Sequence, residues 1–144
     1  MDIREITTRY YVAPQIGAED FETLKSQGFT CVICNRPDEE IPASHHAAAM
    51  EAAAKAAGLA FVINPLTHDT MTDDRLALQR STLEGAEGKV LAYCASGTRS
   101  TVAWVLGHAD SASADELLEA AAQGGYHLDA LRGRIEFLAS RKSD

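Results

Sequence analysis

Residues 90–110 read VLAYCASGTRSTVAWVLGHAD, in which an apolar run, a loop of small residues and a helical pattern follow one another. The run 90–94 is rich in residues that favour β-structure, which predicts a strand that ends at Cys94. A helical pattern then begins near Arg99. A thiol between a strand and a helix, five residues before an arginine, is typical of a reactive site and not of a buried structural cysteine.

The rest of the chain continues this alternation of strands and helices. Short apolar runs predict strands at residues 10–16, 29–35, 60–64 and 90–94. Helical patterns lie between and after them, at residues 18–28, 45–58, 72–85, 113–125 and 128–141 and in the segment after Cys94. We therefore predict an α/β fold of three layers, with a mostly parallel central sheet of four to five strands covered by helices on both faces. The length fits a single domain over residues 1–144.

The charge and cysteine content restrict the partners. The chain has 13 basic and 21 acidic side chains and a net charge of -8, which disfavours nucleic acid and offers no polybasic patch to a membrane. No run is long enough to span a bilayer, and the start, MDIREITTRYYV, lacks the pattern of a secretory signal. Three cysteines fit free thiols in a reducing cytoplasm. We expect a cytoplasmic protein in which any anion site is built from a few local groups.

The residues after Cys94 predict an anion-binding loop. In an open α/β sheet, ligands bind outside the carboxyl ends of the strands, where Cys94 falls. Small residues let the backbone curl and aim several N–H groups into one hollow, to which the next helix adds its own N-terminal N–H groups. We expect the substrate to be bound by the loop residues Ala95, Ser96, Gly97 and Thr98.

Three side chains carry the predicted chemistry. The helix N-terminus and Arg99 are expected to favour the Cys94 thiolate, which is the nucleophilic form of a cysteine. Arg99 also presents a planar fork that clamps an oxyanion through two hydrogen bonds. Ser100 is expected to donate a hydrogen bond to the thiolate or to a leaving sulfur. The alternative, a buried structural Cys94 with a solvated Arg99, leaves the combination of strand, glycine loop, arginine and helix unexplained.

Two further loops are expected at the same edge of the sheet. In NRPD, after the second predicted strand, Arg36 is expected to bring another positive charge to the anion, and Asp38 to orient the anion or Arg99. The alternative for Asp38 is a turn residue that caps nearby N–H groups. In THDT, after the third predicted strand, His68 and Asp69 are the residues best placed to be the general acid that a phosphatase needs. The alternative for both is an ordinary loop position.

The spacing C-x-x-C at Cys31 and Cys34 indicates neither a redox pair nor a metal site. Residues three apart on a strand point to opposite faces of the sheet, so these thiols do not pair easily. The chain has no second cysteine pair for zinc, and His45 and His46 open a helix without other ligands near them in sequence. We expect no metal, no cofactor and a buried Cys31. For Cys34, a core position and a resolving thiol for Cys94 both stay open.

The motif YCASGTRS resembles the cysteine loop shared by rhodaneses and cysteine-dependent phosphatases. The segments YVAPQI, NRPDEE, AAKAAGLAF and SADELLEAAAQGGY are similar to a bacterial family, DUF442, which occurs alone or fused to a β-lactamase-like persulfide dioxygenase domain. The resemblance covers nearly the whole chain. It implies a dual-specificity-phosphatase-like fold, sulfurtransferase or phosphatase activity, and a persulfide dioxygenase as a partner. The family usually reads CRSGTRS, so Ala95 replaces an arginine, which should weaken donor binding.

The length of the loop ranks the activities. Four residues separate Cys94 from Arg99, whereas tyrosine-phosphatase-type loops have five between these positions and rhodanese loops are commonly tighter. This count favours a sulfurtransferase, in which Cys94 attacks the sulfane sulfur of a small anionic donor and carries it as a persulfide. The Arg99–Ser100 pair instead favours a phosphatase that acts on a phosphate ester through a phosphocysteine, with Asp69 protonating the leaving group. A non-catalytic thiol sensor or persulfide-binding module is the third hypothesis.

Overall fold

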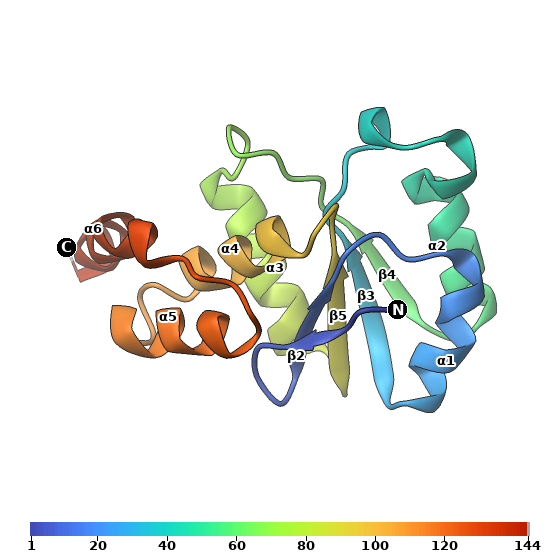
Figure 1. Ribbon diagram of the computed structural model, residues 1–144, viewed down its shortest axis with the longest axis horizontal. Helices are drawn as coiled ribbons and strands as arrows, with labels where there is room; N and C mark the ends of the chain where they lie inside the picture. The colour runs from blue at the N-terminus through green and yellow to red at the C-terminus, as the bar shows by residue number, and fades with distance from the viewer. Residues whose placement is uncertain (144) are drawn as a thin grey trace.

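The computed structural model describes residues 1–143, which form a five-stranded sheet with helices on both faces (Figure 1). The strands are β1 (Arg4–Glu5), β2 (Tyr10–Ala13), β3 (Phe29–Cys34), β4 (Ala60–Ile63) and β5 (Lys89–Tyr93). Their order in the sheet is β1-β2-β5-β3-β4, and every pair is parallel except the antiparallel β1 and β2. This confirms the predicted α/β fold. The sequence pattern does not predict β1, because two residues are too few to show a period.

The helices cover the sheet unequally. On one face lie α1 (Phe21–Ser26) and α2 (Ala47–Ala56). On the other lie α3 (Asp73–Gly85) and α4 (Thr98–Gly107), with α5 (Ala114–Gln123) and α6 (Arg132–Ser143) packed outside them (Figure 1). Short 3₁₀ turns occupy residues 18–20, 38–40, 43–45 and 129–131. Within residues 1–143, no helix combines the length and the apolar character needed to cross a membrane.

The helix starts agree with local sequence signals. Thr72 precedes α3 and accepts a hydrogen bond from the backbone N–H of Arg75. Ser113 precedes α5 and forms the predicted capping box with Glu116. Such caps satisfy N–H groups that have no partner within the helix.

Successive residues of β5 alternate between two apolar cores. Val90 and Ala92 belong to the core that contains α3 and α4, whereas Leu91 and Tyr93 belong to the core that contains α1 and α2. All four are fully buried. Because the strand is covered on both faces, its sequence is continuously apolar and does not alternate.

The carboxyl ends of the parallel strands meet at one edge of the sheet, and hydrogen bonds join the loops that leave it. The backbone N–H of Asn35, just after β3, donates to the Tyr93 carbonyl at 2.9 Å. The N–H of Asn64, just after β4, donates to the Cys34 carbonyl at 2.9 Å. The residues that follow β3, β4 and β5 are thus held close to one another at the edge where the cysteine loop begins.

Replacing Leu91 tests the double-sided burial of β5. We expect Leu91→Ala to lower the free energy of unfolding by about 2–5 kcal/mol, because it leaves a cavity in a close-packed core. Urea denaturation measures this loss. The matched control is Leu78→Ala on α3, where the side chain is 39% exposed and the expected change is below about 0.5 kcal/mol. Similar small losses in both variants would contradict the burial of β5.

Candidate active site

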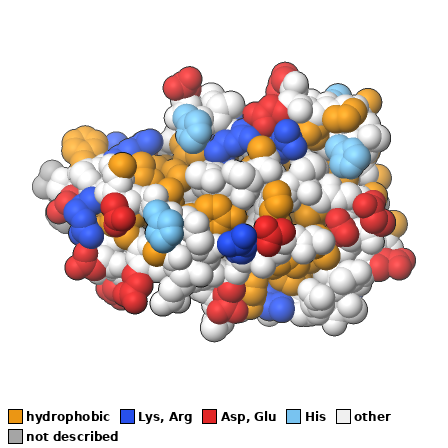
Figure 2. Space-filling view, viewed as in Figure 1, with side chains coloured by type: hydrophobic (Ala, Val, Ile, Leu, Met, Phe, Trp, Pro, Cys, Tyr) orange, Lys and Arg blue, Asp and Glu red, His pale blue; other side chains and the backbone are white. Residues whose placement is uncertain are grey.

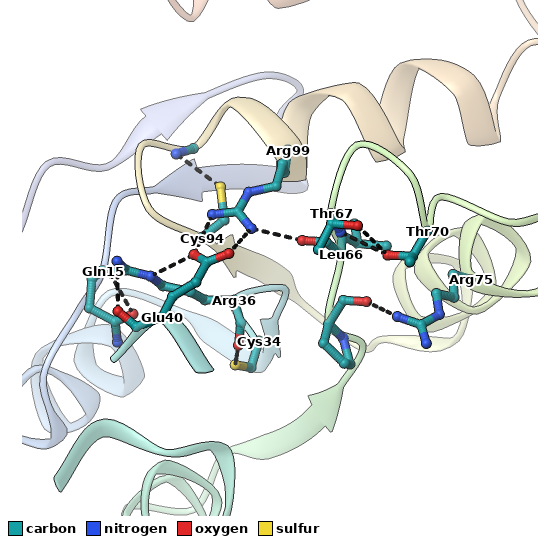
Figure 3. Close-up of polar contacts among 12 residues, drawn as sticks. Gln15, Cys34, Arg36, Glu40, Leu66, Thr67, Thr70, Arg75, Cys94 and Arg99 are labelled. Carbon is teal, nitrogen blue, oxygen red and sulfur yellow. Dashed lines mark hydrogen bonds and ion pairs between the residues drawn. The ribbon is translucent and has the colours of Figure 1, made fainter. Parts of the chain in front are cut away.

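Cys94 is the first residue after β5, and its side chain is buried at the start of a tight loop. Its backbone N–H donates to the Ala13 carbonyl at 3.3 Å, which extends the pairing of β5 with β2. Its Sγ accepts a hydrogen bond from the backbone N–H of Gly97 at 3.1 Å (Figure 3). Gly97 has φ 91°, in the left-handed region that glycine adopts without steric cost. This conformation turns the loop back so that its N–H reaches the sulfur.

The loop leads directly into α4. Gly97 is the N-cap residue, and its carbonyl accepts hydrogen bonds from both the backbone N–H and the hydroxyl of Thr101. Ala95 and Ser96 are exposed at the outer side of the loop, whereas Gly97 is buried. The structure therefore places the sulfur beside the positive end of the α4 dipole, as the sequence predicts. The predicted binding of an anion by the loop residues stays a prediction.

Arg99 is held by a carboxylate that the sequence analysis does not identify. Its Nη1 and Nη2 donate to the two carboxylate oxygens of Glu40, each at 2.8 Å, and Nη1 also donates to the Leu66 carbonyl at 2.8 Å. The Arg99 side chain is only 12% exposed. The hydrogen bonds from Arg99 lower the pKa of Glu40, and Glu40 in turn raises the pKa of Arg99. Both groups are therefore charged at neutral pH.

Arg36 binds the same carboxylate from the other side. Its Nε donates to Glu40 at 3.2 Å, and its Nη1 donates to the Gln15 side chain at 3.4 Å. Figure 3 shows the Glu40 carboxylate between the two guanidinium groups, with that of Arg99 next to the Cys94 sulfur. In Figure 2, basic and acidic side chains lie next to one another above the carboxyl ends of the strands. The structure thus brings the predicted second positive charge close to Arg99, with a carboxylate between them.

Ser100 does not make the predicted contact with the sulfur. Its hydroxyl is fully buried and donates to the Asn35 side-chain oxygen at 2.8 Å. A serine hydroxyl has one hydrogen to donate, so in this arrangement it cannot also donate to Cys94. The prediction that Ser100 hydrogen-bonds the thiolate is therefore wrong for this structure, because a buried oxygen in the core takes the proton.

The partner of Ser100 belongs to a buried polar network. The Asn35 and Gln79 side-chain amides exchange two hydrogen bonds, both at 2.9 Å. Gln79 also accepts from the Asn64 side chain and donates to the Tyr10 hydroxyl, which donates to the Ser100 carbonyl at 2.7 Å. The network links the ends of β3 and β4 to α3 and α4. It fixes the backbone on which the cysteine loop rests.

Asp38 takes the alternative role that the sequence left open. Its carboxylate accepts a hydrogen bond from the backbone N–H of Ala47 at 2.8 Å, at the start of α2, and lies 4.0 Å from His46. It therefore satisfies a free N–H at a helix N-terminus. The predicted role of Asp38 in orienting Arg99 is wrong for this structure, because Glu40 occupies that position.

His68 and Asp69 are exposed on the loop between β4 and α3. Thr67 and Thr70 close a turn around them, with a hydroxyl–hydroxyl distance of 2.9 Å (Figure 3). Leu66, in the same loop, accepts the hydrogen bond from Arg99. The loop that carries both residues therefore adjoins the site, and the role of either as a general acid stays a prediction.

The other two cysteines lie in separate cores. Cys31 packs with the α3 and α4 side of the sheet and Cys34 with the α1 and α2 side, which confirms that the C-x-x-C residues face apart. Burial raises the pKa of the Cys31 thiol to about 11 and also raises the pKa of Cys34. The Cys34 Sγ donates to the Arg36 carbonyl at 3.5 Å. A resolving role for Cys34 stays a prediction.

Among the residues that the structure describes, no group of three or more His, Cys, Asp and Glu side chains could hold a metal ion. A hollow of about 480 Å³ lies elsewhere, where the amino ends of β3 and β4 face the end of α3, and Thr30, Ala60 and Glu87 are among its lining residues.

Two kinds of sequence signal point to the residues that the sequence analysis misses. Both apolar strands, FTCVICN and AFVIN, end in an asparagine, and Gln79 interrupts the apolar stripe formed by Leu76 and Leu83 on α3. A polar residue in an apolar stripe indicates a buried hydrogen-bonded group. Glu40 lies one helical turn after Arg36, but nothing local connects it to Arg99.

A family model and curated relatives identify the same family for this chain. Residues 2–112 match the family model of the phosphatase-like domain of beta-lactamase hydrolase-like protein. The chain is 36% identical over 104 residues to a beta-lactamase hydrolase-like protein of Agrobacterium fabrum, and 35% identical over 107 residues to one of Xylella fastidiosa. These alignments cover 72% and 74% of this chain but 24% and 25% of the relatives. The chain therefore spans about a quarter of their length.

Solved structures share the fold. A phosphatase candidate of Neisseria meningitidis superposes with a TM-score of 0.82 at 29% identity, covering 96% of this chain and 99% of that one. P. aeruginosa TpbA superposes with a TM-score of 0.66 at 17% identity, covering 100% of this chain and 92% of that one. At 17% identity, the similarity to TpbA shows a shared fold and nothing more. The comparisons confirm the predicted family resemblance and the cysteine-phosphatase-like fold.

The role of Ser100 is tested by Ser100→Ala. We expect a loss of about 1 kcal/mol in the free energy of unfolding, because a buried hydrogen bond is removed, and no change in the rate at which iodoacetamide alkylates Cys94. Ser81→Ala, on the exposed surface of α3, controls for the loss of a hydroxyl. A fall of about tenfold in the alkylation rate without a loss of stability would contradict this assignment.

The charge of Glu40 is tested by Glu40→Gln and by its neighbour Glu39→Gln, which is exposed and makes the same charge change. We expect Glu40→Gln to bind inorganic phosphate about three- to tenfold more tightly, because a negative charge is removed beside both arginines. Isothermal titration calorimetry measures the affinity. Because Arg99 lowers the pKa of Glu40, the carboxylate stays charged until the pH falls below the ordinary glutamate range. Equal effects of the two substitutions would contradict a specific role.

Proposed function

Because the chain belongs to the family of phosphatase-like domains of beta-lactamase hydrolase-like proteins, we propose that it is a cysteine-dependent phosphatase that hydrolyses phosphate monoesters. The observation that carries the proposal is the position of the Cys94 sulfur. It receives the Gly97 N–H at 3.1 Å at the start of α4, with a nearly buried Arg99 beside it. A nucleophile among fixed donors is suited to an anionic electrophile.

The reaction has two displacements at phosphorus. The Cys94 thiolate attacks the phosphorus atom, a sulfur–phosphorus bond forms, and the ester oxygen leaves with the electron pair of its bond and takes a proton. Water then attacks the phosphocysteine, loses a proton, and breaks the sulfur–phosphorus bond, which releases inorganic phosphate and restores the thiolate. Arg99, Arg36 and the N–H groups of the loop bind the phosphoryl oxygens in both steps.

Asp69 is our choice for the group that moves the protons. A carboxyl group protonates the leaving oxygen in the first step and, as a carboxylate, accepts a proton from water in the second. The Asp69 loop is joined to the site through the hydrogen bond between Leu66 and Arg99. Asp69 and His68 are exposed, so either side chain is free to approach a bound ester. His68 is the alternative, because an imidazole can make the same two proton transfers.

The length of the cysteine loop supports a second candidate function, sulfur transfer. Only four residues separate Cys94 from Arg99, a tighter cradle than a phosphatase loop. The Cys94 thiolate would attack the outer sulfur of thiosulfate, form a persulfide and release sulfite. The persulfide would pass its outer sulfur to a thiol acceptor, with a persulfide dioxygenase as the consumer of the product. This chemistry requires a reduced Cys94 and hence a reducing compartment such as the cytoplasm.

Hydrolysis of two aryl phosphates tests the phosphatase and its acid together. We expect the wild type to hydrolyse p-nitrophenyl phosphate and phosphotyrosine, and Cys94→Ser to hydrolyse neither. Asp69→Asn should lower kcat/KM, which reports the steps up to departure of the leaving group, about 100-fold for phosphotyrosine, because its leaving oxygen needs a proton. The loss should be much smaller for p-nitrophenyl phosphate, whose leaving group is a stable anion. Asp74→Asn, in the first turn of α3, makes the same charge change and should have no effect.

The same proteins separate the two candidate functions. No turnover of either ester by the reduced wild type would overturn the phosphatase. Intact mass spectrometry after exposure to thiosulfate then tests sulfur transfer. A gain of one sulfur atom in the wild type, absent from Cys94→Ser and removed by cyanide, would establish the persulfide.

A further inference from the structure

Tyr126 touches the cysteine loop from outside the part of the chain that matches the family model. It lies between α5 and the 3₁₀ turn at 129–131, beyond residue 112 where the match ends. Its hydroxyl donates to the Ser96 carbonyl at 2.9 Å. It also lies against Gly97 so closely that a Cβ atom at that position would collide with the hydroxyl. A distant segment thus packs directly on the turn of the loop.

The Ser96 carbonyl and the Gly97 N–H belong to one peptide unit. In a trans peptide, the C=O and N–H bonds are fixed in one plane and point in opposite directions. The carbonyl end accepts from Tyr126 at 2.9 Å, and the N–H end donates to the Cys94 sulfur at 3.1 Å. The peptide is therefore held between the two side chains, and the hydrogen bond at one end determines where the other end points.

The neighbouring hydrogen bonds act on other groups than this peptide unit. The Ser96 hydroxyl bonds Thr98, and the Gly97 carbonyl, which belongs to the next peptide unit, accepts from Thr101. Ser96 is exposed, and Gly97 is a residue whose backbone takes positive and negative φ with similar ease. Rotation of the peptide plane would turn the N–H away from the sulfur and bring the carbonyl oxygen toward it, where it would repel a thiolate. The hydrogen bond from Tyr126 opposes that rotation.

We propose that Tyr126 is a positioning residue for Cys94, which keeps the Ser96–Gly97 peptide oriented with its N–H on the sulfur. The proposal deepens the proposed function and rests on it for the identity of the nucleophile. The same hydrogen bond polarises the peptide, because a donor on a carbonyl strengthens the N–H of that peptide as a donor. Tyr126 thus supports the thiolate without touching it.

The segment that carries Tyr126 is itself well fixed. Gly125 has φ 99°, which ends α5 in a left-handed turn, and the backbone N–H of Tyr126 donates to the Ala121 carbonyl at 2.9 Å. Arg4, from β1, donates to the Gly124 carbonyl at 3.2 Å. Partial burial raises the pKa of Tyr126, so the hydroxyl keeps its proton to donate at neutral pH.

The test is the pH dependence of Cys94 alkylation in Tyr126→Phe. Iodoacetamide is applied at a series of pH values, and the modified sulfur is counted in the tryptic peptide 90–99, which contains Cys94 as its only cysteine. We expect the pH of half-maximal alkylation to rise by about one unit in Tyr126→Phe, because the thiolate loses one oriented donor. Tyr11→Phe is the matched control, since its hydroxyl contacts Glu5 and Thr8.

Folding is followed by thermal unfolding of each variant, and NMR reports the exchange of the Gly97 amide proton with solvent. We expect that exchange to become faster in Tyr126→Phe at an unchanged unfolding midpoint. An unchanged pH of half-maximal alkylation together with an unchanged Gly97 exchange rate would overturn the proposal. Alkylation is read without any substrate, so a protein that hydrolyses no phosphate ester would refute the proposed function and still report on Tyr126.

Discussion

The geometry of the site depends on the side chain of Asn35. Its amide group donates to the Asn64 carbonyl and to Gln79, and its oxygen accepts from Gln79 and Ser100. Its backbone N–H and C=O bond to the residues that end β5 and follow β4. A buried amide is stable only when its donors and acceptors are paired. The core therefore fixes the ends of three strands and the first turn of α4 as one unit.

The residues that fix the backbone of the site are different from the groups that contact the Cys94 sulfur. The hydrogen bonds of the buried network join Asn35, Asn64, Gln79, Tyr10 and Ser100 to one another behind the cysteine loop. The groups at the sulfur are instead a backbone N–H and a guanidinium. Backbone donors held by a helix start and a glycine turn need no rearrangement when an anion arrives. The position of the cysteine loop thus depends on buried side chains that lie behind it.

The sequence predicts the strands and helices but not the long-range side-chain contacts of the site. The apolar runs and caps locate the longer strands and the starts of α3 and α5, because those signals are local. The contact between Arg99 and Glu40 joins positions 59 apart, so only the assembled sheet brings them together. Ser100 is assigned wrongly from the motif because the motif does not reveal Asn35 as a competing acceptor.

For function, too, the local motif and the whole chain give different indications. The spacing within the cysteine loop favours sulfur transfer, whereas our proposal of phosphate chemistry rests on the family of phosphatase-like domains to which residues 2–112 belong. A single loop length reports on the size of the cradle alone. The proposed phosphatase site also includes Arg36, Glu40 and the Asp69 loop, which come from other parts of the chain.

The carboxylate of Glu40 gives the site a resident counter-ion. Two guanidinium groups already share one negative charge before any ligand arrives, so binding at their outer edges is an exchange of one anion for another. A chloride or bicarbonate ion, with a single charge, gains little by displacing a carboxylate of equal charge that is tethered in place. A phosphate ester carries two charges and several oxygen acceptors. In the proposed phosphatase, the tethered carboxylate would therefore act as a filter that disfavours abundant monovalent anions beside Cys94.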